Sequence, residues 1–89
     1  MSMKLWILEP VKNLPEDNNP WIPWYDKMFA VVVRADSEES ARSMAHSCGG
    51  DENDESSDIS PWMELEYSTC KPLEAEGEAR IIILDVHSA

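Results

Sequence analysis

Basic residues are scarce in this chain of 89 residues, in which 7 lysines and arginines stand against 18 acidic residues. The formal net charge is −11, and residues 35–70 hold ten of the acids with Arg42 as their single base. A field of this sign repels nucleic acid and anionic lipid and attracts basic surfaces. The shortage of bases therefore argues against direct binding to DNA, RNA or a membrane surface.

Long hydrophobic runs are also missing from the sequence. The longest is Ile-Ile-Ile-Leu at residues 81–84, whereas a membrane-spanning helix needs roughly 18 apolar residues. The opening, MSMKLWILEP, has too short an apolar part for a secretory signal. Two cysteines, Cys48 and Cys70, are too few for a disulfide framework. We therefore expect a cytoplasmic protein with reduced thiols that act in packing or lie at the surface.

Recognisable catalytic and zinc-binding motifs do not occur. The sequence has no G-x-S-x-G, no phosphate-binding loop, no G-x-G-x-x-G and no C-x-x-C. His46 and Cys48 would point about 200° apart on a helix, which does not suit one zinc ion. If the last two strands form a hairpin around residue 77, Cys70 lies opposite Ile83 and about 13 Å from His87. A Cys–His dyad within that hairpin is therefore disfavoured, and the approach of Cys48 to a histidine would depend on the tertiary fold. We expect no enzyme and no cofactor.

A calcium loop is suggested by spacing and then fails in detail. Asp51, Asn53 and Glu55 match the first, third and fifth positions of an EF-hand loop. Ser56 stands where the motif needs glycine, and Trp62 where it needs a bidentate glutamate. A solvated acidic loop, with loose cation binding as the alternative, describes this segment better than a metal site.

Hydrophobic patterning predicts one domain over residues 1–89 of α+β class. Apolar and β-branched runs indicate strands at residues 3–9 and 28–35. The alternation of Met63, Leu65 and Tyr67 with polar residues indicates a third strand, and the apolar segment RIIILDV indicates a fourth. A helix is expected between the second and third strands, at residues 37–48. The predicted fold is therefore a small antiparallel sheet of about four strands in the order ββαββ, with the helix on one face.

The helix carries the clearest local signals. Asp36 followed by Glu39 fits a capping box. Apolar residues with helical spacing form one stripe, and Gly-Gly at 49–50 provides a stop. The expected members of the stripe are Ala41, Met44, Ala45 and Cys48.

An aromatic loop, NNPWIPWYDK at residues 18–27, follows the first strand. In one interpretation, the indoles of Trp21 and Trp24 cover the sheet face that the helix leaves open, because the last strand is apolar on both faces. Tyr25 and Asp26 would then lie at the rim. In the other interpretation the cluster is an exposed hot spot, since Trp and Tyr dominate binding energy at interfaces. The same loop would form a wall of the pocket if the protein were a small-molecule or peptide binding module.

Carboxylates repeat along the predicted strands. Strand alternation would align Glu64 with Glu66, and Glu74 with Glu76 and Glu78, at a spacing of about 6.8 Å. This spacing is comparable to phosphate separations along a nucleic acid strand. Such rows would let the protein compete for a nucleic-acid-binding partner, although charge of this kind also serves plain solubility.

Three blocks, NPWIPWYDK, VVVRADSEESAR and EYSTC, resemble those of a family of small bacterial proteins that are also carried by phages and plasmids. The resemblance covers nearly the whole chain and implies a single domain, but it implies no particular chemistry. An association with mobile elements implies an inhibitor of a host defence complex, comparable to an anti-CRISPR protein.

These observations lead to one expected function. We expect a non-enzymatic, acidic interaction protein that binds a basic protein surface, including that of a nucleic-acid-binding defence complex. The expected partner-binding residues are Tyr25, Asp26, Asp51, Glu52, Asp54, Glu55, Asp58, Glu64 and Glu66.

Overall fold

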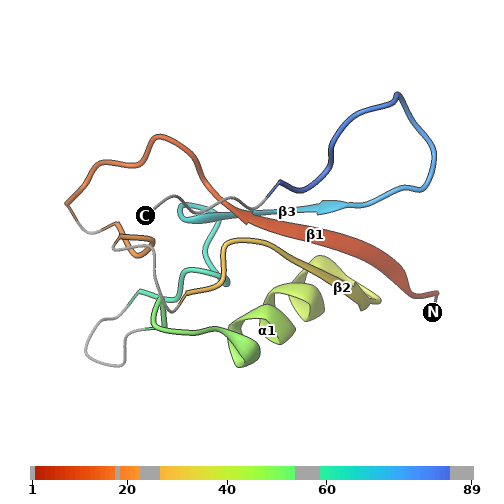
Figure 1. Ribbon diagram of the computed structural model, residues 1–89. Helices are drawn as coiled ribbons and strands as arrows, with labels where there is room; N and C mark the ends of the chain where they lie inside the picture. The colour runs from red at the N-terminus through yellow and green to blue at the C-terminus, as the bar shows by residue number, and fades with distance from the viewer. Residues whose placement is uncertain (1, 18, 23–26, 54–58, 85–89) are drawn as a thin grey trace.

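The computed structural model of the chain describes residues 2–17, 19–22, 27–53 and 59–84. In chain order these residues form strand β1 (Lys4–Pro10), strand β2 (Val31–Ala35), helix α1 (Glu38–Cys48) and strand β3 (Ser68–Pro72). The helix lies along one side of the sheet and contacts all three strands, β2 most extensively (Figure 1). The predicted α+β class is confirmed.

Strand β1 is the central strand of an antiparallel sheet with the order β2-β1-β3. Its sequence suits that position, because Trp6 and Leu8 point to one face while Leu5 and Ile7 point to the other. Pro10 closes the strand, where it removes one ladder hydrogen bond at the least cost. The N-terminal strand therefore forms the middle of the sheet.

The four-stranded order ββαββ is not confirmed. Residues 63–67, predicted as the start of a strand, form turns in which Met63 and Glu64 donate backbone hydrogen bonds to the Ser60 carbonyl. The third strand begins only at Ser68. Within the described part of the last predicted strand, residues 80–84 belong to no strand. Alternation in a short segment follows local periodicity, whereas a ladder also needs a partner strand at the right distance.

Helix α1 begins one residue later than predicted and has a different cap. The Ser37 hydroxyl accepts a hydrogen bond of 3.2 Å from the Ser40 amide, so Ser37 and not Asp36 is the N-cap. The buried face consists of Ala41, Arg42 and Ala45. The predicted stripe is thus only half right, because Met44 and Cys48 are exposed.

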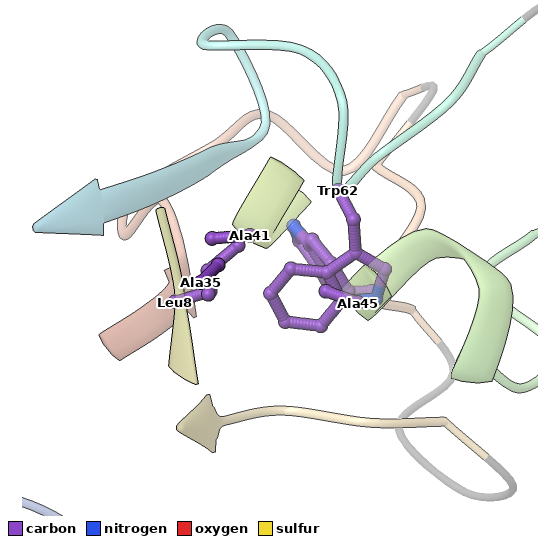
Figure 2. Close-up of a cluster of buried hydrophobic side chains, with 6 residues drawn as sticks. Leu8, Ala35, Ala41, Ala45 and Trp62 are labelled. Carbon is purple, nitrogen blue, oxygen red and sulfur yellow. The ribbon is translucent and has the colours of Figure 1, made fainter. Parts of the chain in front are cut away.

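The hydrophobic core lies between the sheet and α1. Figure 2 shows Leu8 and Ala35 from the strands meeting Ala41 from the helix, with the indole of Trp62 beside Ala45. The two alanines let the helix approach closely, and Trp62, with no exposed surface, fills the remaining volume. Burial of one such large side chain contributes about 1.5–3 kcal/mol.

Trp21 is part of the same core. Its ring centroid lies 4.9 Å from that of Trp62, in an edge-on arrangement, and 6.2 Å from that of Phe29. The indole is buried, as the lid interpretation predicted, but it packs on the helix side of the sheet. The prediction that the aromatic loop covers the opposite face is therefore wrong for Trp21. Trp24 lies outside the described residues.

Candidate partner-binding surface

A buried arginine connects α1 to the segment that follows the acidic loop. The Arg42 side chain donates hydrogen bonds of 3.0 Å to the Trp62 carbonyl, 2.8 Å to the Ser68 hydroxyl and 3.2 Å to the Ser68 carbonyl. Its Nε also forms an ion pair of 2.9 Å with Glu38, one helical turn earlier. The guanidinium fork suits this role because it presents several donors in fixed directions. The single base of the acidic segment is therefore an internal cross-link and not a surface charge.

Glu52 is the acidic counterpart of this arginine. One carboxylate oxygen accepts a 2.7 Å hydrogen bond from the indole Nε1 of Trp62, and the other accepts a 3.1 Å bond from the backbone amide of Met28. The side chain is almost completely buried. The sequence reading placed Glu52 among the partner-binding acids, and the structure corrects this, because a carboxylate held by two internal donors does not face a partner.

The backbone carbonyl of Tyr67 receives a third cross-link, a 3.0 Å hydrogen bond from the indole Nε1 of Trp21. Since Arg42 binds the next residue, Ser68, the three sequence blocks quoted above meet at these two positions. The same bond occupies the polar end of the Trp21 indole. Trp21 is therefore not available as an open pocket wall, which removes one of the two indoles from the alternative of a small-molecule or peptide binding module.

Two acidic segments are brought side by side by the Glu52–Trp62 bond. Asp51 precedes Glu52 in the first segment, and Glu66 lies four residues after Trp62 in the second. Both are exposed. Glu64 is half-buried, and one of its carboxylate oxygens accepts a hydrogen bond of 2.6 Å from the Ser60 amide. We call Asp51, Glu64 and Glu66 the acidic surface. Because residues 63–67 form turns, Glu64 and Glu66 do not form the predicted row with strand spacing.

The other expected partner-binding residues lie outside the part of the chain that the structure describes. They are Tyr25, Asp26, Asp54, Glu55 and Asp58. Of the nine residues expected from the sequence, the structure thus leaves Asp51 and Glu66 exposed and Glu64 half-buried, and it moves Glu52 to the interior. The residues that sequence reasoning missed are Arg42 and Ser68. The only signal for Arg42 was its isolation as one base among ten acids.

Two side chains packed against the core, Cys70 and Tyr67, have raised pKa values. Burial raises the pKa of the Cys70 thiol, Arg42 opposes this shift, and Glu38 adds to it. A thiol with a raised pKa has less of the nucleophilic thiolate at neutral pH, so nothing here activates Cys70. Partial burial also raises the pKa of Tyr67, and the carboxylates of Glu66 and Glu64 raise it further. The Tyr67 phenol is therefore neutral and can donate a hydrogen bond beside the acidic surface.

Among the described residues, no three His, Cys, Asp or Glu side chains gather closely enough to hold a metal ion. Within the same ranges, no helix has the length and apolar character needed to cross a membrane. Comparison of the chain with protein-family models, with curated proteins and with solved structures gave no match. The family resemblance and its implications therefore remain expectations from the sequence.

Proposed function

We propose that this protein is a non-enzymatic interaction protein that uses its acidic surface to bind a basic surface on another protein. The observation that carries the proposal is the concentration of charge, because residues 35–70 supply −9 of the net −11. The charge balance there disfavours nucleic acid as a ligand and favours a basic partner. Complementary charge of this kind accelerates association and selects partners more than it raises affinity.

The contacts of the described acids support a division of roles among them. Glu52 uses its charge internally, against Trp62 and Met28. These bonds anchor the loop that follows α1, and Asp51 is therefore presented on an anchored backbone. A preorganised acidic surface loses less conformational entropy on binding than a flexible tail would.

The biological role that we propose is inhibition of a nucleic-acid-binding complex in a host cell, in the manner of an anti-CRISPR protein. An acidic surface competes with phosphates for the same lysines and arginines, since both are multivalent anions. The acidic excess supports this role, and the family resemblance with mobile elements is consistent with it.

Affinity capture tests the proposal. The tagged protein is used to isolate partners from native lysate of a bacterial host at two salt concentrations, and mass spectrometry identifies them. We expect a partner with a basic surface whose recovery falls steeply as salt rises, because screening weakens exposed charge interactions. The purified partner is then titrated with the wild type, with a D51K/E66K variant and with a control, E16K/D17K, that makes the same change of charge at exposed positions in another loop.

The expected order of affinities is wild type, then the control, then D51K/E66K, with the last at least about tenfold weaker than the control. Equal weakening by both double variants would assign the effect to net charge alone. A partner that binds equally well at both salt concentrations and to all three proteins would contradict the proposal.

A further inference from the structure

The face of the sheet opposite α1 combines apolar and basic side chains. Cross-strand neighbours point to the same face, and the register pairs Leu5 with Arg34 and Ile7 with both Val32 and Lys71. We call these five residues the open face. Leu5 and Val32 are 39% and 40% exposed, and Arg34 and Lys71 are also exposed, whereas Ile7 between them is buried. Glu9, two residues beyond Ile7 in β1, lies on the same face, so two cations and one acid surround an apolar centre in a protein with a net charge of −11.

The segment after β3 carries acidic and apolar residues, in contrast to the basic and apolar residues of the open face. Residues 73–84, which we call the arm, begin where the Leu73 amide donates a 2.9 Å hydrogen bond to the Leu5 carbonyl. Three glutamates and one arginine follow, and then the apolar run at residues 81–84; the charged residues are Glu74, Glu76, Glu78 and Arg80. Figure 1 shows the arm, in blue, arching out beyond β3 on the side away from α1.

The apolar end of the arm is strongly exposed. Its four side chains have exposed fractions of 73%, 42%, 41% and 75% for Ile81, Ile82, Ile83 and Leu84. Three consecutive isoleucines favour a strand, yet residues 80–84 belong to none. A monomeric protein seldom leaves a contiguous apolar surface of this kind uncovered.

The arm also fits loosely on its own sheet. A cavity of about 550 Å³ separates them, lined by Ile7, Glu9 and Lys71 from the sheet and by Glu76, Arg80 and Ile82 from the arm. Gly77, in the first half of the arm, has a backbone φ of +149°, a value that residues with a side chain rarely adopt. It is surrounded by open space. The arm therefore leaves room on the open face that its own side chains do not fill.

We propose that the arm of a second copy of this chain occupies the open face, so that two copies form a dimer by exchanging their arms. The two surfaces complement each other in charge and in polarity. Glu74 and Glu76 of one copy lie against Arg34 and Lys71 of the other, and the apolar run covers Leu5 and Val32. Because both surfaces belong to the same chain, the exchange can be reciprocal, and with two-fold symmetry it closes at two copies.

The length of the arm permits this exchange. Twelve residues span up to about 40 Å when extended, at roughly 3.3 Å per residue. This matches the longest dimension of the described fold, 37 Å. The exchange also uses residues separate from Asp51, Glu64 and Glu66, so it stands independently of the proposed function.

A charge-swap experiment tests the proposal. One variant, R34E/K71E, carries an acidic open face, and the other, E74K/E76K, carries a basic arm. All four substituted positions are exposed. The helical circular dichroism signal verifies that each variant folds. Sedimentation equilibrium over a concentration series measures the mass of each protein. We expect a dimer for the wild type, a weakening of self-association by at least about tenfold for each variant alone, and recovery of the dimer when the two variants are mixed.

The mixture discriminates because only a dimer of unlike chains pairs both arms with faces of opposite charge. A wild type that stays monomeric throughout the series overturns the proposal. Variants that dimerise as well as the wild type, or that fail to recover in the mixture, overturn it as well.

Cysteine cross-linking gives a second readout that does not depend on charge. In a chain with C48S and C70S substitutions, V32C and I82C are introduced singly, and the two proteins are mixed and oxidised. A disulfide between unlike chains, mapped by mass spectrometry, is the expected result. A chain carrying both V32C and I82C that closes only within itself, together with no product from the mixture, would show that the arm stays on its own sheet.

Discussion

Arg42 and Ser68 lie 26 residues apart in the chain, and the guanidinium of the first binds both the hydroxyl and the carbonyl of the second. The Ser68 hydroxyl also donates to the Pro61 carbonyl at 2.7 Å. The arginine thereby closes the segment of residues 61–68 onto α1. Four predictions follow from this arrangement and from the contacts around it.

Replacement of Arg42 by leucine should lower the free energy of unfolding by about 3 kcal/mol, because the Trp62 and Ser68 carbonyls lose their buried donors. Urea denaturation, followed by circular dichroism, measures the change. The matched control is E38A, which removes the ion pair and leaves the carbonyl contacts intact. Since Glu38 is partly exposed, its loss should cost at most about 1 kcal/mol. Equal losses in the two variants would contradict the assignment of the stabilisation to the carbonyl contacts.

Neutralisation of two neighbouring acids, Glu52 and Asp51, should change the stability of the fold by different amounts. E52Q keeps one acceptor oxygen and places an amide NH₂ group against one of the two donors, the Trp62 indole or the Met28 amide, and we expect a loss of about 1–3 kcal/mol in unfolding free energy. D51N, next in the chain and exposed, should change stability by less than about 0.5 kcal/mol. Thermal unfolding of both variants at low and high salt provides the comparison. A stable E52Q protein would show that the carboxylate is not needed in the interior.

The aromatic loop contains its own matched pair. W21A removes a buried indole and its hydrogen bond to the Tyr67 carbonyl, and should destabilise the fold by about 3–5 kcal/mol. I22A alters the adjacent side chain, which is 52% exposed, and should cost less than about 1 kcal/mol. Where W21A is too unstable to purify, W21F retains most of the apolar volume and reports on the hydrogen bond. An unchanged denaturation midpoint in W21F would assign the stabilisation to packing alone.

The two thiols should differ in their reaction with iodoacetamide. Burial raises the pKa of Cys70, so a smaller fraction is thiolate at a given pH, and its alkylation should be slower than that of the exposed Cys48. Raising the pH should increase the rate at Cys70 over a higher range than for an ordinary thiol. Time-resolved mass spectrometry of the two peptides measures both rates, with the urea-unfolded protein as the reference. Faster labelling of Cys70 than of Cys48 in the folded protein would contradict the prediction.

The helix shows how far local signals reach. Its position was predicted within one residue, since capping residues, helical spacing and a Gly-Gly stop act within a few residues of one another. Its buried face was predicted only in part. Hydropathy assigns Met44 to the core and Arg42 to the solvent, and the structure reverses both assignments. Arg42 is buried because the folded chain brings the carbonyl acceptors of Trp62 and Ser68 within its reach.

The sequence by itself determined the acidic charge, the α+β class and the first two strands and the helix, because these depend on composition and on periods of two or of 3.6 residues. The tertiary structure alone decided that β1 is central and that residues 63–67 turn. It also decided that Trp21 and Glu52 belong to the interior. The central place of β1 and the burial of Trp21 and Glu52 depend on partners more than nine residues away in the chain, as the bonds from Trp21 to Tyr67 and from Trp62 to Glu52 show. Burial and strand pairing are properties of two segments at once, and a local pattern describes only one of them.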